Sequence, residues 1–286
     1  MRGRALVLAL LVAAGPARGG GPMEIVVLKR AGIPAHAEVA EEFAEHCRVR
    51  ARVVSFDERP SRLTLPLGSN DIVLAVGQAN VEAILGTPAR VISALAPLPP
   101  PGVYSADTLA PPELVLKALR AAHPGIRRIG VVHGPRTDWL LAAAARTAGP
   151  LGIALVSARA GEAPRALREL HRLGPTVDAV WILPDPDVVS PQLFQYAIQR
   201  QLQDGIPVIA ASRQQVRSGA LLAVDGQPRG AGRRAAAIAN RLLGGGERDP
   251  GAWEQPMRLD VTVNRQIAER LGADVAALTR LGARFE

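Results

Sequence analysis

The sequence predicts an α/β protein made of two domains, each with its own parallel sheet. Short β-branched runs alternate with helical segments from residue 23 to residue 95, and a second alternation begins after residue 112. Between the two lies 96–112, the most proline-rich segment of the chain. Strands that alternate with helices indicate a parallel sheet covered by helices on both faces. The proline-rich segment has no periodic pattern and is expected to link the domains.

The first half of the chain begins with a strand and a helix. The helix expected at 34–47 places Val39, Phe43 and Cys47 on one face. A second helix is expected at 78–86. The strands share runs of Val, Ile and Leu and are expected at 23–29, 49–56, 71–77 and 89–95.

The second half continues the same alternation. Its predicted strands are β-branched and lie at 127–134, 153–159, 178–184, 206–212 and 218–225. Its predicted helices lie at 112–125, 138–152, 163–174 and 191–205. A helix at 229–246 with a glycine cap and a strand-to-helix segment at 258–272 come last. These late elements must return to the earlier sheets, and 244–252 is the segment we expect to be most mobile.

The first 22 residues have the pattern of a secretory signal. Arg2 and Arg4 precede an apolar run from Ala5 to Ala14, and small residues follow. This run is too short to span a hydrocarbon core, which needs about 20 residues. Cys47 is the sole cysteine, so no intramolecular disulfide forms and no cysteine follows the run to carry a lipid anchor. We expect an exported, soluble periplasmic protein.

The formal net charge of +8 raises the question of nucleic-acid binding. Lysine occurs only at positions 29 and 117, and the arginines are spread along the whole chain. Aromatic residues make up 3% of the sequence, which leaves little for stacking on bases. We therefore expect no nucleic-acid partner.

Signatures of catalysis are missing from the sequence. It has no G-x-S-x-G elbow, no H-E-x-x-H, no Walker loop and no Cys/His cluster with metal spacing. The stretch GAGRRA at 230–235 matches G-x-G-x-x-A, but it does not directly follow a first strand, which the dinucleotide fingerprint requires. We expect no catalytic residue, no metal and no cofactor.

Candidate ligand-binding residues lie at the carboxyl ends of the predicted strands, where parallel sheets bind ligands. Gly77 and Gln78 end one strand and open a helix, so their backbone amides are candidates to hold an anion, or they form an ordinary turn. His133 is a binding candidate or a capping or exposed histidine. Ser212 has the same ambiguity, and Asp225 ends the strand at 218–225.

Two aspartates follow the strand at 178–184. Asp185 stands between two prolines at the strand tip, where it either shapes the turn or receives a ligand's amino or hydroxyl group. Asp187 is nearer the next helix, which Ser190 begins as N-cap. We expect Asp187 to satisfy loop or helix N–H groups, and Asp185 is the ligand candidate.

Six segments together resemble one known family. They are DIVLAVGQA (71–79), PPELVLKALRAAHPGIRRIGVVHGPR (111–136), VDAVWILPDPDVVS (177–190), IPVIAASRQQVRSGALLAVD (206–225), GRRAAAIANRLLGG (232–245) and VNRQIAERLG (263–272). In this order they resemble the ABC transporter substrate-binding family, a group with the type I periplasmic binding protein fold that includes aromatic-amino-acid receptors.

The resemblance implies two lobes joined by hinge crossovers, which close over a small ligand. The signal peptide would then cover 1–22, lobe 1 would comprise 23–105 plus 226–254, and lobe 2 would comprise 106–225 plus 255–286. The implied function is that of a monomeric periplasmic solute-binding component of an ABC importer, with a membrane permease as partner. A ligand-sensing module that signals to a membrane receptor is the alternative, and an exported α/β enzyme is less favoured.

Overall fold

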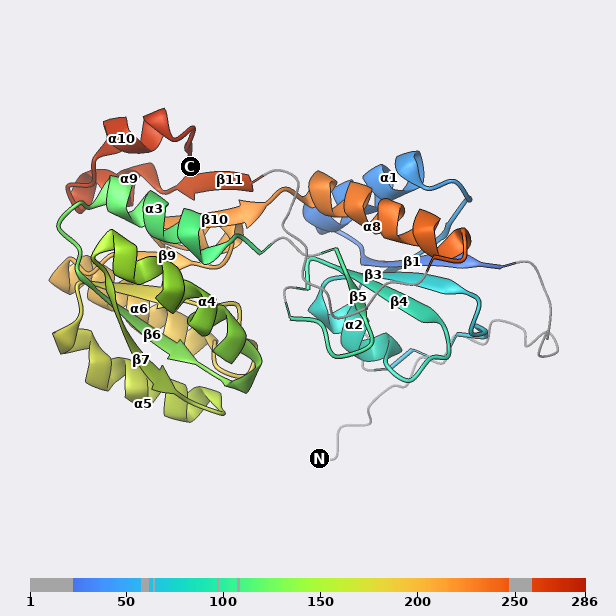
Figure 1. The fold of residues 1–286 in the computed structure, drawn as a ribbon, viewed down its shortest axis with the longest axis horizontal. Helices are drawn as coiled ribbons and strands as arrows, with labels where there is room; N and C mark the ends of the chain where they lie inside the picture. The colour runs from blue at the N-terminus through green and yellow to red at the C-terminus, as the bar shows by residue number, and fades with distance from the viewer. Residues whose placement is uncertain (1–22, 58–61, 64, 97, 107–108, 247–258) are drawn as a thin grey trace, which may run out of the picture.

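Two α/β units make up the computed structural model, which describes residues 23–57, 62–63, 65–96, 98–106, 109–246 and 259–286. They lie side by side, each around its own sheet (Figure 1). The expectation of two α/β domains with largely parallel sheets is confirmed. The expected signal at 1–22 and most of the loop expected at 244–252 lie outside the described residues.

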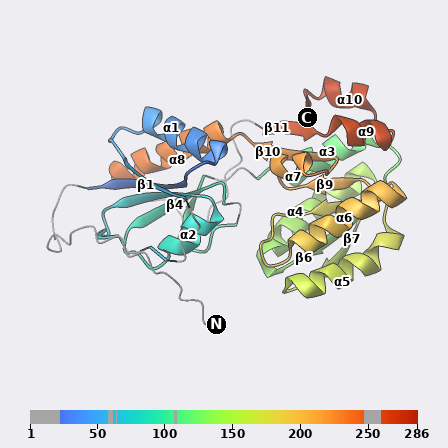
Figure 2. The same cartoon turned by 180° about the vertical axis from the view of Figure 1, so that it is seen from behind.

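The first unit is a five-stranded parallel sheet with the strand order β2-β1-β3-β4-β5. Its strands are β1 (Ile25–Arg30), β2 (Arg52–Phe56), β3 (Ile72–Val76), β4 (Arg90–Ala94) and β5 (Tyr104–Ser105). Helices α1 (Pro34–His46) and α8 (Pro228–Leu243) cover one face, and α2 (Gln78–Ile84) covers the other (Figures 1 and 2). The segment expected to be a linker thus supplies an edge strand, β5.

Side chains alternate between the two faces of this sheet. Ile25 and Val27 pack with α1 and α8, whereas Val26 and Leu28 pack on the side of α2. Because both faces are buried, the strands read as continuous apolar runs rather than as alternating apolar and polar residues.

The second unit is a seven-stranded sheet with the order β12-β11-β10-β9-β8-β6-β7. Its strands are β6 (Arg128–His133), β7 (Ala154–Arg159), β8 (Ala179–Ile182), β9 (Val208–Ala210), β10 (Leu222–Gly226), β11 (Leu259–Val263) and β12 (Arg284–Phe285). The pair β10 and β11 is antiparallel, and the other pairs are parallel. The late strand expected at 258–272 therefore returns to the second sheet.

Helices cover both faces of the second sheet. One face carries α3 (Pro112–Ala122), α4 (Asp138–Ala148), α9 (Arg265–Arg270) and α10 (Val275–Arg280). The other carries α5 (Ala163–Leu173), α6 (Pro191–Asp204) and α7 (Arg213–Arg217). Short 3-10 turns occur at Pro135–Thr137, Gly149–Leu151 and Gly174–Thr176. The short elements α7, α10 and β12 have too few residues for a periodic pattern to show in the sequence.

The GAGRRA stretch at 230–235 lies inside α8 and forms part of a helix contact. A Cβ atom at Gly232 would lie 2.6 Å from the carbonyl oxygen of Val39 and 2.8 Å from the Cβ of Glu42, both on α1. The glycine thus lets the two helices approach closely. The stretch lies within a helix and not in the strand-to-helix loop that a dinucleotide fingerprint occupies.

The chain passes from one unit to the other between β5 and α3, between β10 and α8, and between α8 and β11. Leu109, on the first crossing, forms an antiparallel bridge with Asp225 at the second. Two crossings therefore lie side by side. In the part of the chain described, none of the helices combines the length and the apolar character needed to cross a bilayer.

Candidate functional site

A cleft with a volume of about 1250 Å³ lies between the two units. Its walls come from loops at the carboxyl ends of strands in both sheets: 32–35 after β1, Gln78 after β3, 183–186 after β8 and 211–215 after β9. Parallel sheets place unpaired backbone groups at these ends. The arrangement therefore lets a small molecule contact both units at once.

Four of the residues expected from the sequence line this cleft: Gln78, Asp185, Ser212 and Asp225. Gly77 and His133 are not among its lining residues in the described chain. The side-chain amide of Gln78 donates to Glu82 Oε1 over 3.0 Å, so part of its hydrogen-bonding capacity is used within α2. Ser212 precedes α7, and its side chain makes no capping hydrogen bond there.

Gly77 has a structural role at the tip of β3. Its φ is +88°, and a Cβ atom there would lie 2.8 Å from Cε1 of His36. The ring of His36 is buried, and its Nδ1 accepts the N–H of Arg30 over 3.2 Å. Burial, with smaller contributions from the charges of Arg30 and Lys29, lowers the pKa of His36 to about 4. A neutral imidazole thus supports the turn below the cleft, and only glycine fits beside it.

Leu95 at the tip of β4 has a strained backbone. Its φ is +54°, and it is the only residue other than glycine with positive φ in the described chain. The residue lines the cleft beside the turn at Gly77, whose N–H donates to the carbonyl of Ala94 over 2.7 Å. Backbone strain of this kind is concentrated at functional sites, because it persists only where the surrounding structure holds it.

His133 belongs to a polar group in the second unit. Its Nδ1 lies 2.9 Å from Asp138 Oδ1, and the other oxygen of that carboxylate accepts a hydrogen bond from Arg159 over 2.8 Å. The imidazole is largely buried. Because His133 has this carboxylate partner and lies outside the cleft lining, we do not include it among the proposed ligand-binding residues.

Asp185 lines the cleft, but its carboxylate has internal partners. The residue is 1% exposed. Its Oδ2 accepts hydrogen bonds from the N–H of Gly134 over 3.1 Å and the hydroxyl of Thr137 over 2.7 Å. Its Oδ1 accepts the N–H of Asp187 over 3.1 Å. These bonds fit the turn-shaping alternative, in which Asp185 joins the loops after β6 and β8.

Asp187 is half exposed and lies near Arg136. The guanidinium Nη1 of Arg136 is 3.9 Å from Asp187 Oδ2, and its Nη2 donates to the backbone carbonyl of Leu98. Leu98 follows β4 in the first unit, and Arg136 follows β6 in the second. Arg136 therefore makes a direct hydrogen bond between the two units.

Asp225 stands at the end of β10, where the chain leaves for the first unit. Its Oδ2 accepts the backbone N–H of Arg213 over 3.1 Å. Its partner across the antiparallel pair is Asp260 on β11. Burial first and the charge of Asp260 second raise the pKa of Asp225 to about 6, against the lowering effects of the hydrogen bond from the Arg213 N–H and of the Arg213 charge.

Charged residues that the sequence-based prediction missed also line the cleft: Glu38, Arg213, Arg217, Arg229, Asp260 and Arg284. Arg213 and Arg217 both form ion pairs with Glu286. The hydrogen bond from Arg217 and, to a smaller extent, the hydrogen bond from Arg213 lower the pKa of the Glu286 carboxyl. Arg213 could have been predicted, because it follows the carboxyl end of a parallel strand. Arg284 and Asp260 could not have been predicted in this way, since β12 and β11 reach the cleft only through the antiparallel pairing of β11 with β10.

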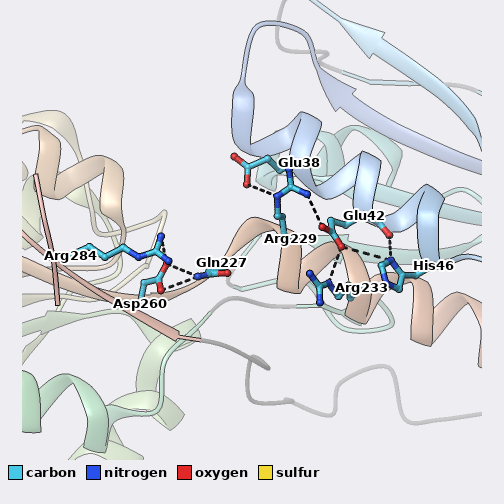
Figure 3. A network of polar contacts seen from close by, with 8 residues as sticks. All are labelled: Glu38, Glu42, His46, Gln227, Arg229, Arg233, Asp260 and Arg284. Atoms are coloured by element: carbon cyan, nitrogen blue, oxygen red, sulfur yellow. Dashed lines mark hydrogen bonds and ion pairs between the residues drawn. The ribbon is translucent and has the colours of Figure 1, made fainter. Parts of the chain in front are cut away.

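Two polar groups flank the crossing between β10 and α8 (Figure 3). On one side the amide of Gln227 donates to Asp260 Oδ1 over 2.9 Å, and Arg284 Nη1 lies 3.2 Å from Asp260 Oδ2. On the other side Arg229 donates to Glu42 on α1 over 2.7 Å. Residues 227 and 229 are thus tied to different units, and Pro228 stands between them.

Glu42, Glu45 and His46 place ligand-type atoms within 4.8 Å of one another. Glu42 already accepts hydrogen bonds from Arg229 over 2.7 Å and from Arg233 over 2.8 Å (Figure 3). Both hydrogen bonds lower the pKa of the Glu42 carboxyl, and the bond from Arg233 has the larger effect. The arginines therefore neutralise this carboxylate, and the group is an ion-pair network between α1 and α8 rather than a metal site.

Comparison with known proteins identifies the family and the fold. Residues 113–278 match the family model described as ABC transporter substrate binding protein. No curated protein matches the sequence.

Among solved structures, a conserved domain protein from Vibrio cholerae aligns with a TM-score of 0.62 at 18% identity, over 92% of this chain and 99% of its own. The ABC domain from Streptococcus pneumoniae in complex with L-Trp aligns with a TM-score of 0.62 at 12% identity, over 93% and 99%. A ligand-free, open substrate binding protein with adhesive properties from Clostridium difficile gives 0.57 at 16%, over 88% and 95%. These similarities show the two-lobe fold of type I periplasmic binding proteins, as the sequence predicts.

Proposed function

Since the chain belongs to the ABC transporter substrate binding protein family, we propose that it is the solute-binding component of an ABC importer. The family consists of substrate-binding proteins and not of enzymes. In the proposed function the two units are the lobes, and they close on a small ligand in the cleft. The observation that carries this proposal is the cleft of about 1250 Å³ lined by strand ends from both sheets.

Closure requires ligand contacts that exist only when both lobes reach the same molecule. A ligand shifts the equilibrium between open and closed forms only by its difference in affinity for the two. Gln78 and the 32–35 loop lie on one wall, and Ser212 and Asp225 lie on the other. A solute held between these walls would therefore favour the closed form.

The lobe limits proposed are 23–105 plus 226–254 and 106–225 plus 255–286. The change of sheet after β5 and after β10 supports the first two limits, and the third lies outside the described residues. The signal pattern at 1–22 supports export to the periplasm. The proposed partners are a small solute and a permease in the inner membrane, and the proposed state of the protein is a monomer.

A thermal-shift screen of the mature protein against amino acids, short peptides, sugars and anions tests the binding function. A ligand at 100 times its dissociation constant stabilises a protein by about 2.7 kcal/mol. We expect one chemical class to raise the Tm, and the same ligand to reduce the radius of gyration in solution scattering. No shift with any compound, or turnover of the ligand by the purified protein, would contradict the proposal.

Transport is tested separately by reconstitution. The ligand found in the screen should stimulate ATP hydrolysis by the permease complex in proteoliposomes only when the binding protein is present. Stimulation of a membrane receptor instead of a permease would assign the protein to sensing.

A further inference from the structure

Two pairs of opposite charges face the cleft on either side of the β10 crossing, one pair in each lobe. Glu38 and Arg229 belong to the first lobe, whereas Asp260 and Arg284 belong to the second. All four line the cleft. In Figure 3 they lie on opposite sides of the crossing, and among the residues drawn no contact joins one pair to the other. Each lobe thus presents an acid and a base to its neighbour.

Glu38 and Arg284 are the weakly held members of these pairs. Glu38 Oε2 is 3.9 Å from Nε of Arg229, and no closer partner occurs among the described residues. Nη1 of Arg284 is 3.2 Å from Asp260 Oδ2. The side chains of Glu38 and Arg284 are 41% and 48% exposed, and exposed ion pairs contribute little to stability. Neither contact therefore holds its side chain firmly.

Both side chains can leave these pairs without depriving their partners of all contacts. Arg229 keeps its ion pair with Glu42 over 2.7 Å. Asp260 keeps the side-chain amide of Gln227, which donates to the two carboxylate oxygens over 2.9 and 3.0 Å. A charged group that retains such a partner avoids most of the cost of an unmade hydrogen bond. The two cleft-facing side chains are therefore free to change partners at small cost.

The contacts of the two side chains lead to the same short segment of chain. Glu38 contacts Arg229, and Arg284 reaches Gln227 through Asp260. Residues 227 and 229 are at most about 7 Å apart, because an extended chain advances about 3.3–3.6 Å per residue. Closure about this crossing turns the two walls toward each other. Opposite charges that meet in a cleft from which water is leaving attract more strongly than in open solvent.

We propose that closure of the lobes brings the Glu38 carboxylate and the Arg284 guanidinium into an ion pair across the cleft, which stabilises the closed form. A guanidinium can bind a carboxylate through two parallel hydrogen bonds, which favours arginine for such a contact. The inference rests on the proposed closure of the lobes and goes beyond ligand binding, because the pair joins protein to protein. It adds to the contribution of whatever solute occupies the cleft.

Pulsed electron paramagnetic resonance on the ligand-free mature protein tests this inference. Spin labels on cysteines introduced by Ser55→Cys on β2 and Arg168→Cys on α5 report the distance between the lobes, and both positions are exposed. Cys47→Ala removes the native cysteine from this background. The ratio of closed to open molecules should fall about two- to fivefold in Glu38→Gln and in Arg284→Gln.

A double variant shows whether the two charges act on each other. Glu38→Gln combined with Arg284→Gln should lower the ratio no further than either single change, because one neutral partner already abolishes the pair. Raising the NaCl concentration from about 0.02 M to about 0.5 M should lower the ratio in the unmodified protein and leave the double variant nearly unchanged. Glu113→Gln and Lys117→Gln are matched controls from an exposed pair on α3 outside the cleft lining, and each should keep the ratio.

Three results would overturn the inference. They are single variants that keep the ratio of the unmodified protein, a double variant whose loss is the product of the two single losses, and one lobe distance common to all variants. None of these measurements uses a ligand, so they are independent of the thermal-shift screen. An unchanged ratio in a protein that binds a compound of the screen leaves the solute-binding function intact. A screen without binding overturns that function, and the lobe distances still decide the ion pair.

Discussion

Asp185 and Asp225 both follow strands of the second sheet and both line the cleft, but their carboxylates have different surroundings. Asp185 accepts three hydrogen bonds from residues of its own unit. Asp225 accepts one, from a backbone N–H. The hydrogen bonds to the Asp185 carboxylate thus stabilise the loops of the cleft wall, whereas the Asp225 carboxylate can still accept hydrogen bonds from a ligand.

Replacement of Asp185 by alanine should therefore destabilise the protein. The change removes the carboxylate acceptor of the N–H of Gly134, the hydroxyl of Thr137 and the N–H of Asp187, and Gly134 and Thr137 keep only their 3.2 Å hydrogen bonds to each other. Each unmade buried hydrogen bond costs about 1–3 kcal/mol. We expect the free energy of unfolding in urea to fall by about 2–4 kcal/mol. Asp187→Ala, which removes a half-exposed carboxylate, is the control and should cost less than about 1 kcal/mol. Equal stability of the two variants would contradict the structural role of Asp185.

Replacement of Asp225 by asparagine should have the opposite effect on the ligand-free protein. Its pKa is raised to about 6 in the folded state, so the folded protein binds the proton more tightly than the unfolded chain, whose pKa is near 3.8. The contribution of this group to stability is unfavourable above pH 6, and it is relieved as the pH falls from 6 to 4.

At pH 8 Asp225→Asn should therefore be more stable than the unmodified protein by about 1–3 kcal/mol. This advantage should shrink as the pH falls through 6 and disappear below about pH 3.8, where the carboxyl becomes protonated in the unfolded chain as well. Urea unfolding at a series of pH values measures both effects. A constant difference across the series would show that the pKa of Asp225 is not the cause.

At the scale of elements, the contact between α1 and α8 joins segments far apart in the sequence. Gly232 sits against the Val39 carbonyl and the Glu42 Cβ, and Glu42 in turn pairs with Arg229 and Arg233 (Figure 3). The close approach of the helices and the ion pairs beside it hold the helix that follows the crossing onto the first lobe.

Gly232→Ala should separate these helices. A Cβ atom 2.6 Å from a backbone oxygen cannot be accommodated by a side-chain rotation, and overpacking of this kind costs typically about 1–3 kcal/mol. Gly230→Ala is a matched control in the same helix, where no atom lies within 4 Å of the added Cβ. It should leave stability unchanged or raise it by about 0.5–1 kcal/mol, because alanine is the better helix former. Thermal unfolding of the two variants checks this, and similar Tm values would refute the packing role of Gly232.

At the scale of the whole molecule, three contacts of the described residues bear on the relation between the lobes. Arg136 donates to the carbonyl of Leu98 across the lobes, and Gln227 and Arg229 anchor the β10 crossing to the two sides. Large motions about such crossings are possible because the few residues between two anchored points absorb the change in backbone angles.

Arg136→Ala should open the ligand-free molecule. Loss of the hydrogen bond between the lobes removes a restraint on the lobe angle, so we expect a larger radius of gyration in solution scattering than for the unmodified protein. Arg172→Ala removes an exposed arginine paired with Glu169 within α5, and should scatter like the unmodified protein. An unchanged radius for Arg136→Ala would show that the crossings alone set the angle.

Much of the architecture could be predicted from local patterns. Val, Ile and Leu runs predicted the strands from β1 to β10 except β5, which lies in the segment expected to be a linker, and the amphipathic segments between the strands predicted the long helices. These patterns survive in the sequence because a strand buried on both faces needs apolar residues throughout, and a surface helix needs one apolar face. The short elements α7, α10 and β12, and the antiparallel direction of β11, could not be predicted in this way.

The sequence by itself determined the two α/β domains, the position of the strand ends and the resemblance to a family of substrate-binding proteins. Only the tertiary structure decided what each strand-end residue does. Asp185 meets Thr137 and Gly134 across 48 and 51 positions of sequence, whereas Asp225 meets a second carboxylate, Asp260, on a strand that arrives later. The physical reason is that the environment of a carboxylate depends on donors and charges contributed by distant segments, while the strand that carries it depends on its own neighbours.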